Sequence, residues 1–449
     1  MNGISSSPGG YAGTGSAPRT WLANISEGLA HLSAQQLILA CIALTAGLQL
    51  HLVFVQAFNW DEYFFLSHVY ALHDGRLETA LQSFHTRLFA WLPLLGLGEV
   101  AGLRIGRLVM LGCELLTVAC IVGIAKTFVS VPAALLAGLA YLSGGFVFQH
   151  GFAFRYDPLA AALLMSALYL MFARRLTVPV IVIVAGLCAL SFLVTIKSIF
   201  FAPAFLGAVL WTCRNAEDRR DYLVRVSAIA VLIPAFAIPA FLLHSLAIAD
   251  PATIDAPGAI GGAGATVFSK GFFPRLHFMA KQAQIAPFLT VFLCLAPIAL
   301  MFGKRRISER VTLALLFSPA LTFAFYWNSF PYFYAFILPP AAIAGAIVIE
   351  GLARRYRSAV VGVCLAANAL GLYLVTPKEV QAVQADILTA VHTLFPEPVP
   401  YIDFNAMVPS FPKQNFFMSD WGMETYYAGD LEDFAAVFER EPVPLLIAN

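Results

Sequence analysis

The sequence predicts an all-α polytopic membrane protein with about 11 transmembrane helices and a small α/β domain at its C-terminus. The chain of 449 residues is 60% apolar and only 12% charged, whereas soluble domains carry roughly 25% charged residues. Its apolar residues gather in runs near the 20 or so residues that a helix needs to cross a bilayer. The formal charge of +1 says nothing about partners, but the lack of a basic patch argues against nucleic acid.

Eleven apolar runs predict the transmembrane helices. They cover residues 34–58, 107–128, 131–149, 158–173, 178–195, 198–213, 224–247, 285–303, 310–327, 331–350 and 358–375. All seven cysteines fall inside these runs or at their edges, and none belongs to a CxxC motif. This distribution argues against a disulfide framework and against a cysteine-ligated metal.

Basic residues fall in every second connection, and this pattern sets the orientation of the chain. They are Arg19, Lys126, Arg174, Arg175, Arg214, Arg219, Arg220, Arg225, Lys304, Arg305, Arg306, Arg310, Arg354, Arg355 and Arg357. Cytoplasmic loops carry an excess of Lys and Arg, so these connections are predicted to face the cytoplasm of a bacterial inner membrane. The N-terminus is then cytoplasmic, and the C-terminus is periplasmic.

Residues 88–103 (LFAWLPLLGLGEVAGL) are apolar but are not predicted to cross the membrane. If they did, every later basic connection would lie outside, against the positive-inside rule. The segment is also short, and Pro93, Glu99 and three glycines interrupt it. We therefore expect a juxtamembrane helix that lies in the membrane interface.

The segments outside the spans differ in composition. The first 33 residues are rich in Ser, Gly and Pro and are predicted to form a disordered cytoplasmic tail. Residues 34–375 are predicted to form the transmembrane domain, in which residues 59–106 make up a periplasmic loop with juxtamembrane helices and candidate site residues. Residues 248–284 are predicted to be a periplasmic lid that orders on substrate, because structureless loops of this length are usually functional or disordered.

Residues 376–449 are predicted to form the small periplasmic α/β domain. Helical patterns cover residues 378–394 and 431–440, and strand-like runs cover residues 401–404, 416–419 and 444–448. The chain ends on an apolar run, as a truncated chain would.

The stretch at residues 59–88 (NWDEYFFLSHVYALHDGRLETALQSFHTRL) holds the densest cluster of acids, histidines and arginines near a membrane boundary. It predicts a helix from Trp60 to Asp74, with Asn59 or Asp61 at its cap and Gly75 closing it. Two interpretations of the Asp61-Glu62 pair stay open. The acids cap the helix and favour its dipole, or they supply a carboxylate base at the membrane surface.

Other ionisable residues are predicted at the same outer ends of the spans. The acids are Asp61, Glu62 and Asp157, and the cations are Arg107, Arg155 and Lys197. Each alone is explained by solvation or snorkelling, but ionisable residues at such depths are functional candidates. Their convergence at one predicted depth favours a common site.

This set of residues suits sugar transfer from a polyprenyl phosphate. The phosphate is already a good leaving group, so its departure needs charge neutralisation by Lys or Arg more than a general acid. The acceptor hydroxyl needs a base within hydrogen-bond reach. One carboxylate and a basic phosphate clamp are therefore sufficient.

Several further residues are secondary candidates. His85 and Arg87 in the first loop, and Lys270 and Arg275 in the second, could contact substrate. His68 and His85 could join an acid around a divalent metal, although their spacing matches no strong metal motif. Tyr334 lies in an aromatic stretch (FYWNSFPYFYAFILPP) that is either an interfacial belt or a wall of the substrate pocket. No P-loop, GxGxxG, GxSxG or HExxH motif supports a nucleotide-driven or hydrolytic reaction.

The order of these motifs resembles the GT-C membrane glycosyltransferases, in particular the group of protein O-mannosyltransferases and the lipid A aminoarabinose transferase. The resemblance covers roughly residues 35–350. It consists of WDEYFF after the first span, HTRLFAWLPLL as a juxtamembrane helix, Arg107-Leu108, Arg155-Tyr156-Asp157, Thr195-Ile196-Lys197 and PYFYAFILPP.

The resemblance implies that Asp61 is the base or orients the acceptor, and that Lys197 contacts the lipid phosphate. The chain departs from the family at Phe84-His85-Thr86-Arg87-Leu88, where the family often has His/Lys-Pro-Pro-Leu.

The sequence therefore predicts an inverting glycosyltransferase that takes a sugar from a polyprenyl-phosphate carrier. The periplasmic acceptor stays open among lipid A, a polysaccharide, a glycolipid and a protein. Glu62 or Asp157 is expected to orient Asp61, and no cofactor is required by this chemistry. The alternatives are a transporter or flippase of a lipid-linked sugar, which needs charges near mid-membrane, and a non-catalytic subunit of an envelope complex.

Overall fold

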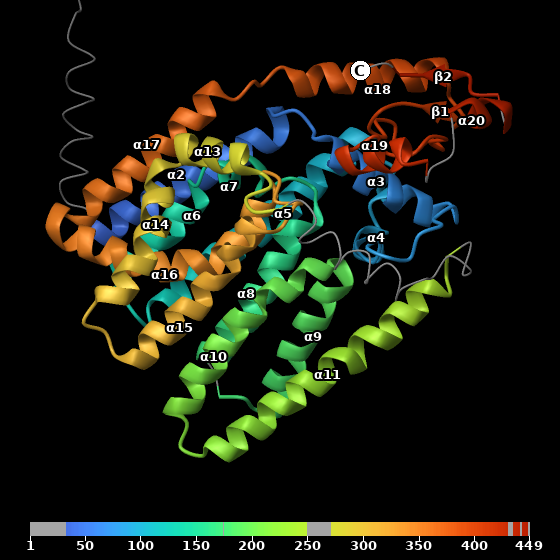
Figure 1. Cartoon of the computed structure of the whole chain (residues 1–449). Helices are drawn as coiled ribbons and strands as arrows, with labels where there is room; N and C mark the ends of the chain where they lie inside the picture. Colours follow the sequence, from blue (N-terminus) through green and yellow to red (C-terminus); the bar gives the residue numbers. More distant parts are fainter. Residues whose placement is uncertain (1–32, 174, 249–270, 430–433, 441, 448–449) are drawn as a thin grey trace, which may run out of the picture.

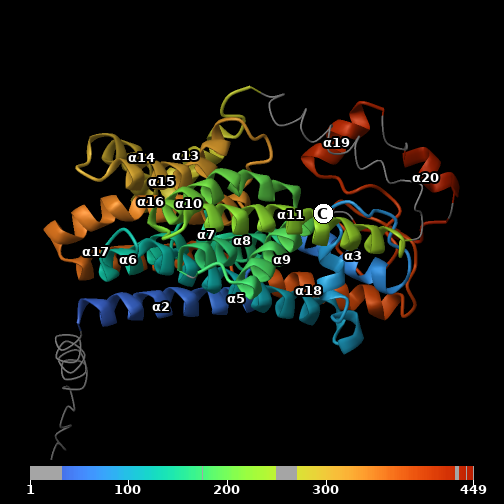
Figure 2. The same ribbon diagram turned by 90° about the horizontal axis from the view of Figure 1, so that it is seen from below.

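The computed structural model describes residues 33–173, 175–248, 271–429, 434–440 and 442–447. The predicted N-terminal tail, most of the predicted lid and the end of the predicted last strand lie outside these residues. Helices dominate the described part, and most of them run side by side (Figures 1 and 2).

Eight helical segments in the described residues are long and apolar enough to cross a membrane. They are α2 (Ala34–Val55), α5 (Gly98–Ala125), α8 (Tyr156–Ala173), η2 with α10 (Ile196–Phe201 and Ala202–Asn215), α11 (Arg219–Ser245), α15 with η4 (Ile307–Phe317 and Ser318–Ala324), α16 (Phe333–Tyr356) and α17 (Ser358–Val375). Each overlaps a run that hydropathy predicts to be a span, which confirms a polytopic helical fold.

Three other predicted spans are shorter or bent. α6 (Val131–Leu142) and α9 (Val178–Val194) are apolar but fall below the length of the eight. α13 (Leu276–Ile285) and α14 (Pro287–Phe302) meet at an angle of 114° and make a ninth span if they are counted together. The predicted number of eleven is therefore not confirmed.

The predicted span at residues 131–149 is interrupted, which is a correction. α6 ends before Ser143, and the short helix α7 (Phe146–His150) starts after Gly145, whose φ is +58°. Gln282 of α13 compensates for the break: its amide oxygen accepts from the N–H of Phe146 at 2.9 Å, and its amide nitrogen donates to the carbonyl of Gly144 at 3.1 Å. Irregular backbone at membrane depth needs such partners from the protein.

The predicted juxtamembrane helix at residues 88–103 is also wrong as a single element. α4 (His85–Phe89) and η1 (Pro93–Leu95) are short, and Gly96 and Gly98 have φ of +63° and +75°. Residues in this left-handed region interrupt a helix, which is why glycine occupies them. The last residues of the segment belong instead to the first turn of α5.

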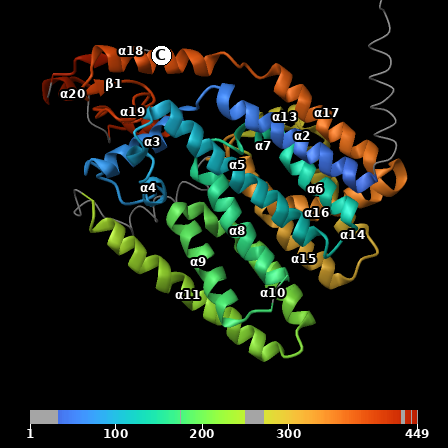
Figure 3. The same cartoon turned by 180° about the vertical axis from the view of Figure 1, so that it is seen from behind.

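The C-terminal segment packs on the first loop. It contains α18 (Val380–Leu394), α19 (Asp420–Tyr427), α20 (Phe434–Arg440), and the two-residue strands β1 (Tyr401–Ile402) and β2 (Leu445–Leu446), which pair in parallel. Leu388, Tyr401 and Phe411 share a hydrophobic core with Phe58 and Leu66 of the first loop. The elements lie together at one end of the molecule (Figures 1 and 3). The predicted strand at 416–419 is wrong, because these residues form no strand.

The candidate site residues and the basic connections lie at opposite ends of the helices. α8, α10 and α16 each begin near Asp157, Lys197 or Tyr332, and each runs toward one of the basic connections. The acids and cations singled out by the sequence therefore lie at the end opposite to these basic connections.

Candidate active site

The first loop begins with α3 (Trp60–His73), whose start is fixed by local hydrogen bonds. The side chain of Asn59 accepts from the backbone N–H of Asp61 at 3.1 Å, and Glu62 Oε1 accepts from the backbone N–H of Asn59 at 2.8 Å. This is a capping box, and Gly75 follows the helix with φ of +69°. The helix predicted from Trp60 to Asp74 is confirmed, as is the capping role of Glu62. The side chain of Asp61 takes no part in this cap.

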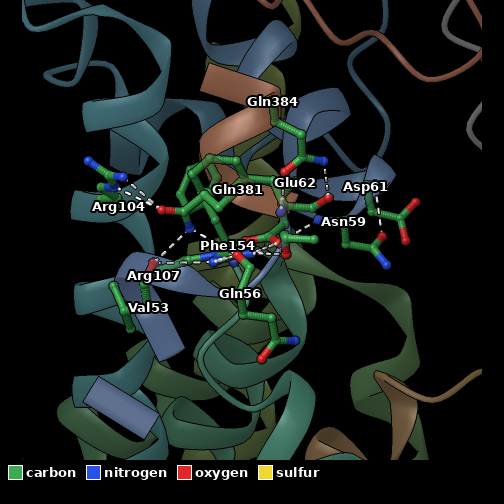
Figure 4. A network of polar contacts seen from close by, with 12 residues as sticks. Val53, Gln56, Asn59, Asp61, Glu62, Arg104, Arg107, Phe154, Gln381 and Gln384 are labelled. Carbon is green, nitrogen blue, oxygen red and sulfur yellow. Dashed lines mark hydrogen bonds and ion pairs between the residues drawn. The ribbon is translucent and has the colours of Figure 1, made fainter. Parts of the chain in front are cut away.

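Glu62 and Arg107 form a buried ion pair at the start of α3 (Figure 4). Arg107 donates from Nε and one terminal nitrogen to Glu62 at 2.7 and 2.6 Å, and its other N–H groups donate to the carbonyls of Val53, Gln56 and Ala57. Glu62 also accepts from the N–H of Phe154 at 2.8 Å. Both side chains are only 1% exposed.

These contacts leave Arg107 with no donor for a ligand in this conformation. A guanidinium has five N–H groups, and each one is used by Glu62 or by the three carbonyls at the end of α2. The pair joins the end of α2, the start of α3, α5 and the segment before α8. Its geometry is that of a structural anchor rather than that of a phosphate clamp.

A second cluster links Asp61, Arg155, Asp157 and Lys197. Arg155 forms ion pairs with Asp61 and, from Nε at 3.2 Å, with Asp157. Asp157 accepts from Lys197 Nζ at 2.9 Å. The side chains of Arg155, Asp157 and Lys197 are at most 8% exposed, whereas that of Asp61 is 23% exposed. Asp61 is thus the member of this cluster that is open to an incoming group.

The four members come from three element ends: the start of α3, the start of α8 and η2. Asp157 lies in the first turn of α8, and Arg155 directly precedes it. Lys197 lies in η2, after α9 ends at Thr195, whose hydroxyl accepts from the N–H of Lys197 at 3.4 Å. Arg155 and Lys197 are therefore held at two helix ends that the fold brings together with the start of α3.

Aromatic rings surround the two cations. Arg155 Cζ lies 3.3 Å from the centroid of the Tyr332 ring, and Lys197 Nζ lies 4.7 Å from that of Tyr156. Such contacts attract a partly desolvated cation to the ring face. Burial raises the pKa of Tyr332 to about 12, so its hydroxyl is neutral at pH 7. Tyr332 belongs to the aromatic stretch for which a pocket wall was one of two interpretations, whereas the site prediction missed Tyr156, although it lies between Arg155 and Asp157 in sequence.

Lys197 differs from Arg107 in its unused donors. An ammonium has three N–H groups, and Lys197 Nζ makes one hydrogen bond within the described residues, to Asp157. The remaining donors face the rings of Tyr156, Tyr332 and Phe333 at 4.7 to 5.9 Å. This cation can therefore contact an anionic oxygen without breaking its pair with Asp157.

Three of the secondary candidates, Arg87, Tyr334 and Arg275, make other contacts. Arg87 Nε donates to His244 at the end of α11 at 3.1 Å. The ring of Tyr334 packs on Phe323 at 4.5 Å between centroids, so Tyr332 rather than Tyr334 faces the cations. Arg275 packs on Phe330, 4.1 Å from its ring centroid. Lys270 lies outside the described residues.

His85 is buried between Phe65 and Tyr156, near the cluster. Neither ring nitrogen makes a hydrogen bond of normal geometry to the described residues. Its ring centroid lies 6.4 Å from that of His68. No three His, Cys, Asp or Glu side chains in the described ranges gather as a metal site would require, so the arrangement gives the His68–His85 metal hypothesis no third ligand.

We expect the first loop to lose stability in acid because of His85. Burial, with a smaller contribution from neighbouring His68, lowers the pKa of His85 from 6.5 to about 3. Below pH 6.5 the unfolded chain gains a proton that the folded chain excludes, so stability falls as pH drops from about 6.5 toward 3. The slope reaches about 1.4 kcal/mol per pH unit for one such group. Thermal unfolding between pH 7.5 and 4.5 measures it.

The variant His85→Phe should make this acid dependence shallower. His73→Phe, at an exposed position of the same loop, is the matched control and should leave the slope unchanged. An equal slope in wild type and His85→Phe would contradict the assignment of this pH dependence to His85.

A cavity of about 420 Å³ lies beside the start of α3. Its walls come from the end of α2, the start of α3, α7 and the turn between α17 and α18. The lining residues are Gln56, Ala57, Phe58, Asn59, Trp60, Glu62, Arg107, Gln149, His150, Phe152, Ala153, Val375, Thr376, Pro377 and Val380.

No protein-family profile and no curated protein sequence matches this chain. Solved structures do match it in fold. ArnT from Cupriavidus metallidurans bound to undecaprenyl phosphate superposes with a TM-score of 0.62 at 14% identity, covering 94% of this chain and 91% of ArnT. The apo state of the same protein gives a TM-score of 0.61 at 15% identity.

A second protein shares the fold more distantly. The archaeal oligosaccharyltransferase AglB from Archaeoglobus fulgidus, in complex with an inhibitory peptide and a dolichol-phosphate, gives a TM-score of 0.50 at 12% identity. The match covers 84% of this chain and 64% of AglB. ArnT, a lipid A aminoarabinose transferase, and AglB are both GT-C enzymes.

This chain has the GT-C fold. The resemblance expected from the short motifs is thereby confirmed at the level of fold. In this chain the cluster of Asp61, Arg155, Asp157 and Lys197 lies at the helix ends next to the first loop. No ligand role of a single residue follows from the fold alone.

Proposed function

We propose that this chain is an inverting glycosyltransferase that moves a sugar from a polyprenyl-phosphate carrier to a hydroxyl-bearing acceptor. The observation that carries the proposal is the Asp61–Arg155–Asp157–Lys197 cluster, which places a partly open carboxylate beside two buried cations. The GT-C fold supports it, because ArnT with that fold has been solved with undecaprenyl phosphate bound.

In the proposed reaction the residues of the cluster have separate roles. Asp61 accepts the proton of the acceptor hydroxyl as its oxygen attacks the anomeric carbon of the sugar. The bond from that carbon to the phosphate oxygen breaks, and the electron pair leaves with the lipid phosphate. Lys197 and Arg155 neutralise the charge on the departing phosphate. A single displacement inverts the anomeric configuration.

Asp157 is a positioning residue in this proposal. It accepts from both Arg155 and Lys197, so it holds two like charges close together that would otherwise repel each other. Glu62 and Arg107, which the sequence placed in catalysis and phosphate binding, are assigned a structural role instead. The two side chains form hydrogen bonds with each other and with backbone groups.

We further propose that the site faces the periplasm of a bacterial inner membrane. The Lys- and Arg-rich connections lie at the other end of the helices, and such connections remain in the cytoplasm. The acceptor would then be an envelope component. Labelling of single-cysteine variants in the 59–88 loop with an impermeant thiol reagent on intact cells tests the sidedness.

The proposed function is tested with the purified full chain in lipid nanodiscs. The protein is incubated with the lipid-linked sugars and envelope lipids extracted from its own source membranes, and the products are followed by mass spectrometry. We expect a time-dependent gain of free polyprenyl phosphate and of one hexose or pentose mass on an acceptor. Unchanged masses of donor and acceptor after exhaustive incubation would overturn the proposal.

Replacing Lys197 with methionine is expected to weaken binding of undecaprenyl phosphate about 10- to 100-fold, because a charge-assisted hydrogen bond to the phosphate is lost. Titration of the lipid into the purified protein, followed by native mass spectrometry, measures the effect. Lys126→Met is the matched control, because Lys126 is an exposed lysine at the far end of α5. Equal weakening in both variants would contradict a specific role for Lys197.

A further inference from the structure

The cavity beside the start of α3 is lined by both apolar and uncharged polar side chains, and its lining carries no net charge. Its charged lining residues are Glu62 and Arg107, which neutralise each other. Burial lowers the pKa of His150 to about 4, so this side chain is neutral at pH 7. The other polar groups are the amides of Gln56, Asn59 and Gln149, the indole of Trp60 and the hydroxyl of Thr376.

One amide in the cavity has an unused acceptor. Gln56 Nε2 donates to the carbonyl of Gln149 at 3.1 Å, which fixes the orientation of the side chain. Gln56 Oε1 is buried and has no hydrogen-bond partner among the described residues. Buried polar atoms are nearly always paired, and a ligand hydroxyl can donate to this oxygen once the Gln56 side chain turns it toward the cavity.

The cavity and the charge cluster share two short segments of backbone. Asn59 and Trp60 line the cavity, and Asp61, which follows them, pairs with Arg155. Phe152 and Ala153 line it as well, and Arg155 lies two residues beyond. Asp61 therefore pairs with the cationic cluster and is adjacent in sequence to Trp60 and Glu62, which line the cavity.

We infer that this cavity binds the acceptor through an uncharged, hydroxyl-rich head group, a carbohydrate rather than a phosphate. This inference rests on the proposed function and names the substrate class of its second site. Amide groups pair with hydroxyls as donors and acceptors, and the Trp60 ring offers an apolar face with a polar edge. Its volume of about 420 Å³ lies within the range of small-molecule sites.

A phosphate would bind this cavity poorly. Arg107 has given all its donors to Glu62 and to backbone carbonyls, and no other cation lines the walls. An anion placed there would lose its hydration without gaining a counter-charge. The lipid phosphate is instead expected at Lys197, which does not line the cavity.

The test measures binding rather than turnover. Dihexosyl diacylglycerol is titrated into the full chain in nanodiscs, and phosphatidic acid with the same acyl chains serves as the anionic comparison. Native mass spectrometry counts the bound lipid. We expect one saturable dihexosyl diacylglycerol per protein, with phosphatidic acid showing no saturable site at this position.

Two variants locate the lipid. Gln56→Leu and Gln149→Met should each weaken the binding of dihexosyl diacylglycerol about tenfold. Each substitution removes a polar partner of a ligand hydroxyl. Gln35→Leu is the matched control at the exposed start of the same helix. Binding of undecaprenyl phosphate should be unchanged in all three, which also reports that they fold.

The outcomes separate this inference from the proposed function. If Gln56→Leu and Gln149→Met bind the glycolipid like wild type, or if phosphatidic acid competes equally, the acceptor cavity is refuted while the transferase proposal stands. If wild type binds glycolipid at this site but releases no polyprenyl phosphate in the transfer assay, the proposed reaction fails and the cavity remains.

Discussion

Replacing Asp61 with asparagine is expected to reduce sugar transfer about 10²- to 10⁴-fold, the range that general-base catalysis typically contributes. Asparagine keeps the size of the side chain and a carbonyl oxygen toward Arg155, but it cannot take the proton of an acceptor hydroxyl. Initial rates of transfer from the lipid-linked donor, measured at saturating donor and acceptor, report this loss.

The fold and donor binding should survive this substitution. The cap of α3 uses the backbone N–H of Asp61 and the side chain of Glu62, neither of which changes. Arg155 keeps its pair with Asp157. Asp74→Asn, at the other end of the same helix, is the matched control and should transfer sugar at the wild-type rate. Wild-type turnover in Asp61→Asn would reject Asp61 as the base.

Replacing Arg107 with methionine is expected to destabilise the fold by about 3–5 kcal/mol, because it leaves the carboxylate of Glu62 buried without its counter-ion. It also removes donors from three carbonyls at the end of α2. Unfolding in mixed micelles, followed by tryptophan fluorescence, measures the change. Arg104→Met is the matched control one turn away, because Arg104 donates to the neutral amide of Gln381 and should cost about 1 kcal/mol.

A second substitution separates a structural anchor from a phosphate ligand. Adding Glu62→Gln to Arg107→Met removes the stranded charge, and the new amide oxygen can still accept from the N–H of Asn59 or Phe154. We expect the double variant to recover part of the stability and part of the undecaprenyl phosphate binding. If the Arg107→Met protein is fully stable and has lost only phosphate binding, Arg107 is a phosphate ligand and the structural role is rejected.

Substitution of Arg107 is expected to reduce stability, whereas substitution of Lys197 is expected to reduce lipid binding. The reason for this difference lies in contacts that the sequence does not reveal. Both are cations at the outer ends of predicted spans, and both were assigned to the phosphate. Arg107 meets an acid 45 positions earlier in the chain and three carbonyls of another helix. Lys197 meets an acid 40 positions earlier and otherwise faces aromatic rings.

The sequence by itself determined the features that depend on consecutive residues. Apolar runs give the membrane helices, because burying them in lipid depends on local hydropathy. Basic connections predict their orientation. The start of α3 follows from Asn59 and Glu62, which are three residues apart and close the capping box within one turn.

Only the tertiary structure decided which helix ends meet. It joined Asp61 to Arg155 and Asp157 to Lys197, gave Glu62 to Arg107, broke the span at Gly145 against Gln282, and packed the C-terminal segment on the first loop. Each of these contacts joins residues far apart in the chain. Their partners depend on how the helices pack against each other, and hydropathy or capping within a single helix carries no information about that packing.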